Sequence, residues 1–401
     1  MKRSKVISCS QSLIDGSHND RYNKNIEEEI KALPKIDLHR HLTGSVRFKT
    51  ILDILREFKL EAPFDNNRKT PLRDDIVQLK KFIQIKEPLA NQARFIDRVW
   101  GVLNKLIVNE EVVSRLTYEA IEDASQDNII YVEFRVSPYG KMNGNGSQKR
   151  TFSFPDFLKA LRNGIDKARY EYPNTIAKIV LSIPRHTVFR RLRDFADIKR
   201  LQKFADDIIS PCLDYKNSYV VGFDLSGKVE GYSSWHQRNV KWPPCLYRPI
   251  FKRIKESHFG VTIHAGENDS ADSIREAVEF LGADRIGHGI KAKEDPLILD
   301  FLRENKIPLE ICPTSNIRLG LTSSLANHPI REYYDLGLCT TINTDDPAVF
   351  DITLSSECLD LVKNENIHFT LHELKCNISN SLYAAFASND EKQRLQENLY
   401  I

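Results

Sequence analysis

Short apolar runs alternate with longer stretches of helical periodicity along most of the chain. Eight runs have the length of strands, and several are continuously apolar, as in strands that helices cover on the outside. The predicted strands are Ile36–His41, Ile129–Val136, Ala177–Ile183, Tyr219–Leu225, Phe259–His264, Asp284–His288, Ile307–Cys312 and Leu338–Asp345. The stretches between them carry amphipathic patterns, such as Val112, Leu116 and Ala120 at helical spacing. Eight strands that alternate with helices predict an α/β fold, a (β/α)8 barrel of the TIM type.

Two segments are additional to the strands and helices of a minimal barrel. Residues 48–128, between the first and second strands, hold several helices' worth of sequence, including predicted helices over Phe48–Phe58 and Asp75–Ile85. A helical insertion at this position lies over the C-terminal face of a barrel and can close a pocket there. Gly140–Ser147 is rich in Gly and Asn and predicts a surface loop. Neither segment resembles a domain linker, so we expect one barrel domain.

The N-terminal end differs in character from the rest. Residues 1–30 are polar and charged, and we expect them to form a surface extension, with a short helix over residues 25–32, ahead of a domain formed by residues 31–401. The start is basic, but only Val6 and Ile7 are apolar before polar residues return. A secretory signal needs about 7–15 apolar residues, so we expect a cytoplasmic protein.

Composition narrows the class of partner. The chain has 401 residues and a formal net charge of +3, from 58 Lys and Arg against 55 Asp and Glu. Nucleic-acid and membrane surfaces normally require a clustered basic excess, and no apolar run approaches a membrane span, so we expect a small-molecule partner. The 7 cysteines are scattered without a Cys-x-x-Cys pair, which excludes a thiolate zinc site and fits a reducing compartment.

The first predicted strand ends in two histidines, His39 and His41. Side chains two positions apart on a strand share a face, so both imidazoles point the same way, as the ligands of a divalent metal do. A His-x-His pair by itself is more often incidental than metal-binding.

Three further predicted strands end in imidazole or carboxylate groups. The fifth runs into Thr262-Ile263-His264-Ala265-Gly266-Glu267, the sixth into Gly287-His288-Gly289 and the eighth into Asn343-Thr344-Asp345-Asp346-Pro347. In a closed barrel these ends meet at one face. Independent capping or core roles account for any one of these groups but poorly for all together. We therefore expect one pocket that contains His39, His41, His264, Glu267, His288, Asp345 and Asp346.

The other histidines are predicted to be structural or exposed. His186 follows the third predicted strand, and this position is equally consistent with a side chain that lines the pocket and with one on the surface. The remaining six are His18, His236, His258, His328, His368 and His372.

From about Leu33 to its end, the chain resembles the adenosine deaminase family of the metal-dependent amidohydrolase superfamily. The segments that carry the resemblance, in order, are LPKIDLHRHLTGS (33–45), YVEFRVSP (131–138), GFDLSG (222–227), HAGE (264–267), RIGHG (285–289), CPTSN (312–316), HPIREYYDLG (328–337) and NTDDP (343–347). Residues 1–30 and 228–250 match less well.

The resemblance implies one zinc per chain, bound by His39, His41, His264 and Asp345 with a position left open for water. Imidazole and carboxylate ligands with an open position are typical of hydrolytic rather than structural zinc sites. The resemblance then implies attack of that water on C6 of a purine, with ammonia leaving. His288 would stabilise the attacking oxygen, and Glu267 would carry a proton to N1.

The purine would be held by two further groups. The resemblance implies that Asp346 binds N7 and that the backbone N–H of Gly227 binds N3. A backbone donor approaches a ring edge closely only where no side chain intervenes, although an ordinary turn glycine is the alternative.

Two departures from the family pattern bear on the substrate pocket, and the first concerns the sugar end of the substrate. Adenosine-specific members usually carry Asp where this chain has Thr43, and that acid contacts the ribose 5′-hydroxyl. A neutral Thr43 removes a charge that would repel phosphate, which opens the way to 5′-modified substrates. Against this, Pro347 follows the tandem aspartates, as in adenosine deaminases, where branches acting on N6-methyl-AMP tend to have Lys. Lys228 opens a longer, more basic segment than the family has, extending to Arg248.

Three functions remain open. The first is deamination of a purine nucleoside, most simply adenosine or 2′-deoxyadenosine. The second is deamination of another aminopurine, such as adenine, N6-methyl-AMP or a 5′-modified adenosine. The third is a catalytically silent binding protein, which loss of a ligand or of Glu267 would signal. Nucleic-acid editing deaminases use a Pro-Cys-x-x-Cys motif that this chain lacks, and none of the eight predicted strands ends in the bridging lysine of a binuclear site.

Overall fold

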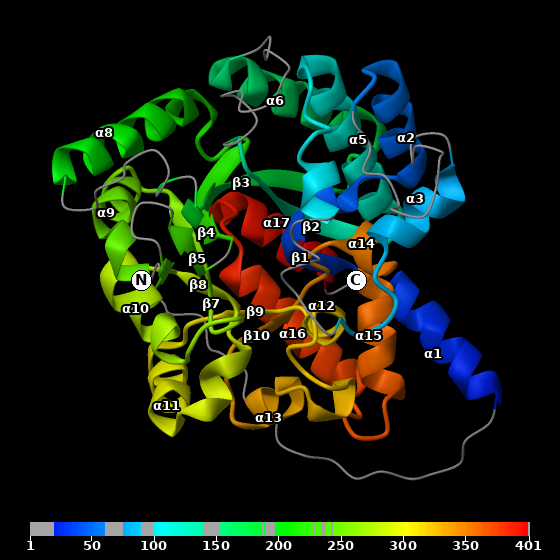
Figure 1. The fold of residues 1–401 in the computed structure, drawn as a ribbon. Helices are drawn as coiled ribbons and strands as arrows, with labels where there is room; N and C mark the ends of the chain where they lie inside the picture. Colours follow the sequence, from blue (N-terminus) through cyan, green and yellow to red (C-terminus); the bar gives the residue numbers. More distant parts are fainter. Residues whose placement is uncertain are drawn as a thin grey trace.

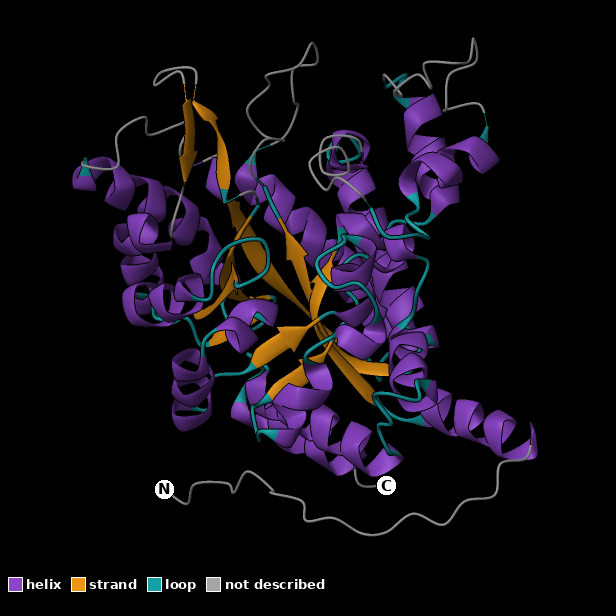
Figure 2. Cartoon of the chain, turned by 60° about the horizontal axis from the view of Figure 1, so that its bottom comes forward, coloured by secondary structure: helices purple, strands orange, loops and turns teal. Residues whose placement is uncertain are grey.

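The computed structural model describes residues 20–60, 75–89, 99–138, 153–186, 188, 197–227, 229–233, 238–241 and 244–399. Its centre is an 8-stranded parallel sheet in the order β1-β2-β3-β4-β7-β8-β9-β10, with helices around the outside (Figures 1 and 2). The strands are β1 (Lys35–His41), β2 (Ile129–Val136), β3 (Ile176–Pro184), β4 (Val220–Ser226), β7 (Gly260–Ala265), β8 (Arg285–His288), β9 (Leu309–Ile311) and β10 (Thr340–Ile342). The predicted (β/α)8 barrel is confirmed.

The chain closes the barrel between the end of β10 and β1. Asp345 donates its backbone N–H to the carbonyl of His39 at 2.8 Å and accepts the N–H of His41 at 2.7 Å. These bonds form an isolated parallel bridge between Arg40 and Asp345. β9 and β10 are shorter than predicted, and β9 ends where Cys312 becomes the N-cap of α12 (Pro313–Arg318).

One barrel helix follows each strand. In chain order these helices are α5 (Glu110–Gln126), α6 (Phe154–Glu171), α8 (Ile198–Ile209), α9 (Arg248–Glu256), α10 (Asp272–Leu281), α11 (Pro296–Asn305), α13 (Ile330–Asp335) and α16 (Leu371–Ala384). Side-chain caps start several of them, since Asn109 caps α5 and Ser153 forms a capping box with Asp156 on α6. The predicted stripe of Val112, Leu116 and Ala120 is buried, with Ala120 in the main barrel cluster and Val112 and Leu116 against the insertion after β1.

The insertion after β1 is helical, as predicted. It contains α2 (Phe48–Glu57), α3 (Ile76–Ile83) and a helical stretch over residues 99–103. Its apolar side chains form a separate cluster that includes Leu319 of the barrel and Val349 and Phe350 of α14 (Pro347–Phe350). Trp100 brings the insertion to the carboxyl ends of the strands, because its ring centroid lies 5.7 Å from that of His41.

The segment after β4 contains an element that the sequence pattern did not predict. β5 (Glu230–Ser233) and β6 (Arg238–Lys241) pair as an antiparallel hairpin, which projects from the barrel (Figure 2). The predicted loop Gly140–Ser147 lies outside the described residues.

The N-terminal helix is longer than predicted. α1 (Asp20–Ala32) begins before residue 25, and its Ile26 and Ile30 are buried in the main hydrophobic cluster beside α15 (Leu354–Lys363). The last turn of α16 and the helix α17 (Asn389–Leu399) cover the opposite, amino end of the strands, where Leu395 is buried with the residues that open β1 and β2. Within the described part of the chain, no helix has both the length and the apolarity needed to cross a bilayer.

Candidate active site

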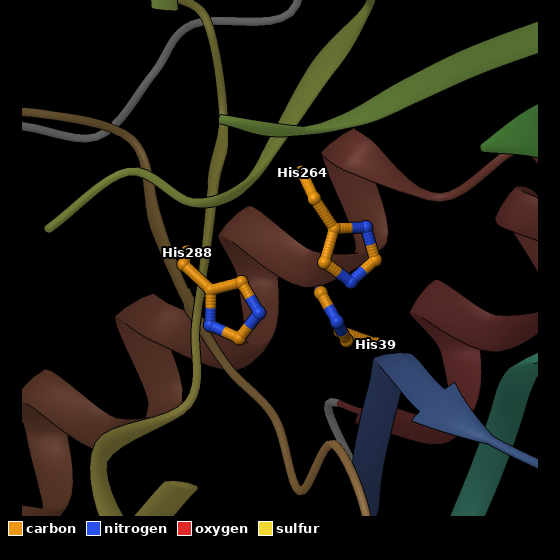
Figure 3. A group of neighbouring side chains, drawn as sticks. All are labelled: His39, His264 and His288. Carbon is orange, nitrogen blue, oxygen red and sulfur yellow. The ribbon is translucent and has the colours of Figure 1, made fainter. Parts of the chain in front are cut away.

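The imidazoles predicted at the strand ends lie together. β1 carries His39 and His41, β7 carries His264 and β8 carries His288. The ring centroid of His39 lies 4.7 Å from those of both His264 and His288, and Figure 3 shows these three rings turned toward one another. Their potential ligand atoms all lie within 4.8 Å of one another. These four imidazoles come from two parts of the chain, 39–41 and 264–288, that are at least 223 positions apart, and they meet at one face of the barrel.

Asp345 adds a carboxylate to this cluster. Its Oδ1 lies 3.3 Å from His41 Nε2 and 3.5 Å from His39 Nε2, and its Oδ2 accepts a hydrogen bond from Ser315 Oγ at 2.7 Å. Burial by itself favours the neutral acid, but the imidazoles that face it, His39 first, hold the pKa of Asp345 well below its ordinary value. One carboxylate oxygen thus faces two imidazole nitrogens, while the other is held by a hydroxyl.

Two of the imidazoles are oriented by buried carboxylates. His39 Nδ1 lies 3.0 Å from Glu310 Oε2, and His264 Nδ1 lies 2.9 Å from Asp224 Oδ1. A carboxylate can only accept, so each Nδ1 carries the proton and each Nε2 presents a lone pair. His39 Nε2 is buried without a hydrogen-bond partner among the described residues. This carboxylate–histidine pairing is typical of metal ligands. A metal bound at His39 Nε2 would supply the partner that this buried nitrogen lacks.

The carboxylate behind His39 is itself anchored by cations. Glu310 contacts Arg135, accepts a hydrogen bond from Arg285 Nε at 2.6 Å and accepts another from Thr262 Oγ1 at 2.9 Å. Although burial favours the neutral acid, the guanidinium groups of Arg135 and Arg285 hold the pKa of Glu310 well below its ordinary value. The orientation of His39 is therefore fixed by charges inside the barrel.

Two other acidic side chains at the site have pKa values that are raised rather than lowered. Burial, followed by the charges of Asp345 and Asp269, raises the pKa of Glu267 to about 8. Burial and the charges of Asp345 and Glu267 raise the pKa of Asp346 well above its ordinary value. Neutral carboxyl groups at neutral pH can donate a proton or a hydrogen bond, as groups in active sites often must. Glu267 Oε1 lies 3.8 Å from His288 Nε2.

The backbone is unusual at two of these positions. His288 has a φ of 64° and Asp345 a φ of 61°, both in the left-handed region that side-chain-bearing residues seldom occupy. Such conformations persist where the surrounding structure imposes them, and they are concentrated at functional sites.

The turn after β1 lies against Asp346. Thr43 and Gly44 are buried in a short 3-10 helix, η1 (Thr43–Ser45), which contacts α14. A Cβ on Gly44 would lie 1.7 Å from Asp346 Oδ1, so only glycine leaves room for this carboxyl group. Thr43 is 5% exposed.

Gly227 lies just past β4 with a φ of +85°. Its carbonyl accepts a hydrogen bond from Arg185 Nη1 at 2.9 Å, and Arg185 Nη2 donates to the carbonyl of His264 at 2.6 Å. His186 is exposed beside this turn, and its Nδ1 would lie 3.7 Å from a Cβ on Gly227. Arg185 thus ties the end of β4 to the end of β7.

Several side chains that complete the site were not predicted as site residues. They are Arg135, Asp224, Arg285, Glu310, Ser315 and Asn316. The signal that could have found Asp224 and Glu310 is a lone charge within an apolar strand, because a charge is rarely buried without a partner. Ser315 and Asn316 are uncharged and lie on α12, so they carry no such signal.

A parallel barrel whose strand ends gather imidazoles and carboxylates around one point is the fold and site of a metal-dependent hydrolase. The sequence profile of the adenosine deaminase family matches residues 34–401. An adenosine deaminase of Serratia proteamaculans (strain 568) is 32% identical over 368 residues, which cover 92% of this chain and 98% of the relative. The chain belongs to the adenosine deaminase family, whose members are metal-dependent hydrolytic enzymes.

Solved structures share the fold. The crystal structure of adenine deaminase from Arthrobacter aurescens has a TM-score of 0.73 at 22% identity, with 92% of this chain and 98% of that chain covered. An amidohydrolase from Burkholderia ambifaria with bound zinc has a TM-score of 0.73 at 24% identity, with 93% and 91% covered.

Proposed function

We propose that this protein hydrolyses the 6-amino group of a purine nucleoside, most simply converting adenosine or 2′-deoxyadenosine and water to inosine or 2′-deoxyinosine and ammonia. The observation that carries the proposal is the pairing of an imidazole–carboxylate cluster with a neighbouring acid, Glu267, whose pKa is raised to about 8. Hydrolytic deamination needs both an activated water and a proton for the ring, and these are the groups that supply them.

One zinc ion fits the donor set of His39, His41, His264 and Asp345. The carboxylates behind His39 and His264 leave each Nε2 free to ligate, and Asp345 Oδ1 faces His39 and His41. When bound, zinc lowers the pKa of a coordinated water and so supplies a nucleophile near neutral pH.

Glu267 and His288 act on the reacting atoms. Glu267, whose pKa burial raises, transfers a proton to N1, which breaks ring aromaticity and makes C6 electrophilic. His288 holds the attacking oxygen over C6 by a hydrogen bond from Nε2, the nitrogen on the side of Glu267.

Asp346 and Gly227 hold the base, and Thr43 lies toward the 5′ end of the sugar. A neutral Asp346 donates a hydrogen bond to N7, which agrees with its raised pKa and with the lack of a partner for its Oδ1 among the described residues. Gly227 presents its N–H to N3 from a left-handed turn that Arg185 steadies.

The second candidate is deamination of another aminopurine, namely adenine, N6-methyl-AMP or a 5′-modified adenosine. It is favoured by Thr43, which is buried and neutral. Adenosine-specific members usually have a carboxylate at this position that contacts the 5′-hydroxyl of the ribose. A silent binding protein is disfavoured because every proposed ligand and Glu267 is present.

The test is a panel of adenosine, 2′-deoxyadenosine, adenine, AMP, N6-methyl-AMP and 5′-modified adenosines, followed by absorbance and ammonia release and paired with metal analysis. We expect adenosine or 2′-deoxyadenosine to have the highest kcat/KM, with about one zinc per chain. Ammonia from none of these compounds by metal-loaded protein would refute the proposal, and preference for another member would select the second candidate. Residues 31–401 as the catalytic domain and a cytoplasmic location stay predictions, which truncation and fractionation would test.

A further inference from the structure

A row of hydrogen-bonded side chains extends from His288 away from the reacting atoms. Asn316 Nδ2 lies 3.1 Å from His288 Nδ1, and Asn316 Oδ1 lies 3.2 Å from His328 Nε2. At the far end, the backbone N–H of Ile330 donates to His328 Nδ1 at 3.2 Å. Asn316 and His328 come from the CPTSN and HPIREYYDLG segments, and neither residue has a part in the chemistry above. All three side chains are buried, so water does not compete for these bonds.

The direction of each hydrogen bond follows from the far end. A backbone N–H can only donate, so His328 Nδ1 must be an acceptor. Burial, together with the charge of Lys293, lowers the pKa of His328 to about 3, so its imidazole is neutral and carries its one proton on Nε2. That proton needs an acceptor, which is Asn316 Oδ1. The amide nitrogen of Asn316 therefore faces His288 and donates to its Nδ1.

An imidazole that accepts at Nδ1 carries its proton on Nε2. In His288 this is the nitrogen 3.8 Å from Glu267 Oε1. His39 and His264 have the opposite arrangement, because Glu310 and Asp224 accept at their Nδ1 atoms and leave each Nε2 bare. The group behind each ring thus decides whether the ring can ligate a metal or donate a hydrogen bond.

We propose that Asn316 and His328 are positioning residues that hold His288 in the Nε2–H tautomer. They thereby make it a hydrogen-bond donor and keep it out of the metal ligand set, although its nitrogen lies within 4.8 Å of ligand atoms of His39 and His264. The inference rests on the proposed function, since the donor serves the attacking oxygen. The tautomer itself can be measured independently of turnover.

The direct test is long-range ¹H–¹⁵N correlation spectroscopy on zinc-loaded, full-length protein with ¹⁵N-labelled histidine. Signals missing from His288→Ala assign His288, and the wild type should show the Nε2–H pattern. Asn316→Asp places a carboxylate behind His288, which accepts both from His328 and from His288 Nδ1. We expect His288 to change to the Nδ1–H pattern in this variant, with a loss of about 100-fold in kcat, the usual effect of removing a donor to a developing oxyanion.

A second pair of variants covers the case in which Asn316→Asp fails to fold. His328→Phe removes the donor to Asn316 Oδ1, so the amide is free to turn and His288 should show mixed tautomers, with kcat reduced more than KM is changed. His328→Gln restores a donor to Asn316 and should recover the Nε2–H pattern and most of the lost turnover. His372→Gln, on the exposed side of α16, is the matched control and should behave as wild type.

The outcomes separate the two proposals. An Nδ1–H pattern for His288 in the wild type, or an unchanged Nε2–H pattern in both Asn316→Asp and His328→Phe, would overturn the positioning role even if the enzyme deaminates adenosine. The expected tautomers in a protein inactive on the whole panel would support the positioning of His288 while refuting the proposed function.

Discussion

Gly44 and Asp346 are in such close contact that a single methyl group between them would lie 1.7 Å from Asp346 Oδ1. Gly44→Ala should therefore displace the carboxyl group proposed to hold N7, while leaving the metal ligands in place. A displacement of about 1 Å costs on the order of 100-fold in turnover, and we expect a loss of this size. Gly101→Ala is the control, because a Cβ there meets nothing within 4 Å. Equal kinetics in the two variants would contradict the role of Asp346.

Glu267→Gln keeps the shape of the side chain but removes the transferable proton. We expect kcat to fall by about 100- to 10,000-fold, with KM and metal content little changed. Glu279→Gln, exposed on α10, should match wild type. Activity of Glu267→Gln within a few-fold of wild type would exclude Glu267 as the acid.

His264→Ala and His288→Ala should differ in metal content. His264 is backed by Asp224 and assigned as a ligand, so its loss should release zinc, whereas His288→Ala should keep zinc and lose most turnover. Metal analysis after mild dialysis distinguishes them. Loss of zinc in both variants, or retention in both, would show that the division of roles is wrong.

Thr43→Asp tests the sugar end of the substrate. The new carboxylate should accept from a 5′-hydroxyl and repel a 5′-phosphate, each by about 1 kcal/mol, or about fivefold in kcat/KM. Adenosine turnover should hold or rise while activity on 5′-phosphorylated substrates falls. Thr43→Asn adds an acceptor without the charge and separates the two effects. If Thr43→Asp alters all substrates equally, specificity must come from residues 48–128 or 228–250.

Glu357, on α15, should make stability depend on pH. Its Oε2 accepts the N–H of Thr314 at 3.2 Å, its Oε1 has no partner among the described residues, and burial is the main cause that raises its pKa to about 8. Between the ordinary pKa of about 4.3 and this value, the unfolded chain releases a proton that the folded protein keeps. Stability is therefore lost as the pH rises through this window, by at most about 1.4 kcal/mol per pH unit.

Glu357→Gln should remove this dependence. Urea denaturation at pH 5, 7 and 9 should show a stability advantage of the variant that grows with pH, while the exposed Glu365→Gln shows none. An advantage independent of pH would mean that Glu357 does not titrate in this range.

The sequence predicted the architecture well because several barrel strands are continuous apolar runs and helical patterns lie between the strands. β2 has the predicted bounds, and the imidazoles at the ends of β1, β7 and β8 meet as expected. The hairpin β5–β6 was missed because its strands are not part of the buried barrel sheet, so they lack the apolar run that marks a barrel strand.

The supporting charges could not be predicted because their partners are distant in the chain. Glu310 shows in the sequence as a lone acid in an apolar strand, but its partner His39 lies 271 positions away. His328 is buried and is linked to His288 through Asn316, and the expectation of a structural or exposed residue did not include this link. Such relationships depend on which strand ends become neighbours, which the spacing of apolar residues does not encode.

The backbone bridge between Arg40 and Asp345 has a consequence for biosynthesis. The same hydrogen bonds that join the first and last strands place His39 and His41 beside Asp345, and nearby Thr344 and Asp37 are bonded across 307 positions of the chain. During translation, the complete set of proposed ligands cannot assemble until the last strand has emerged from the ribosome. Acquisition of the metal should thus coincide with closure of the barrel, and a nascent chain stalled before residue 345 should be unable to retain zinc.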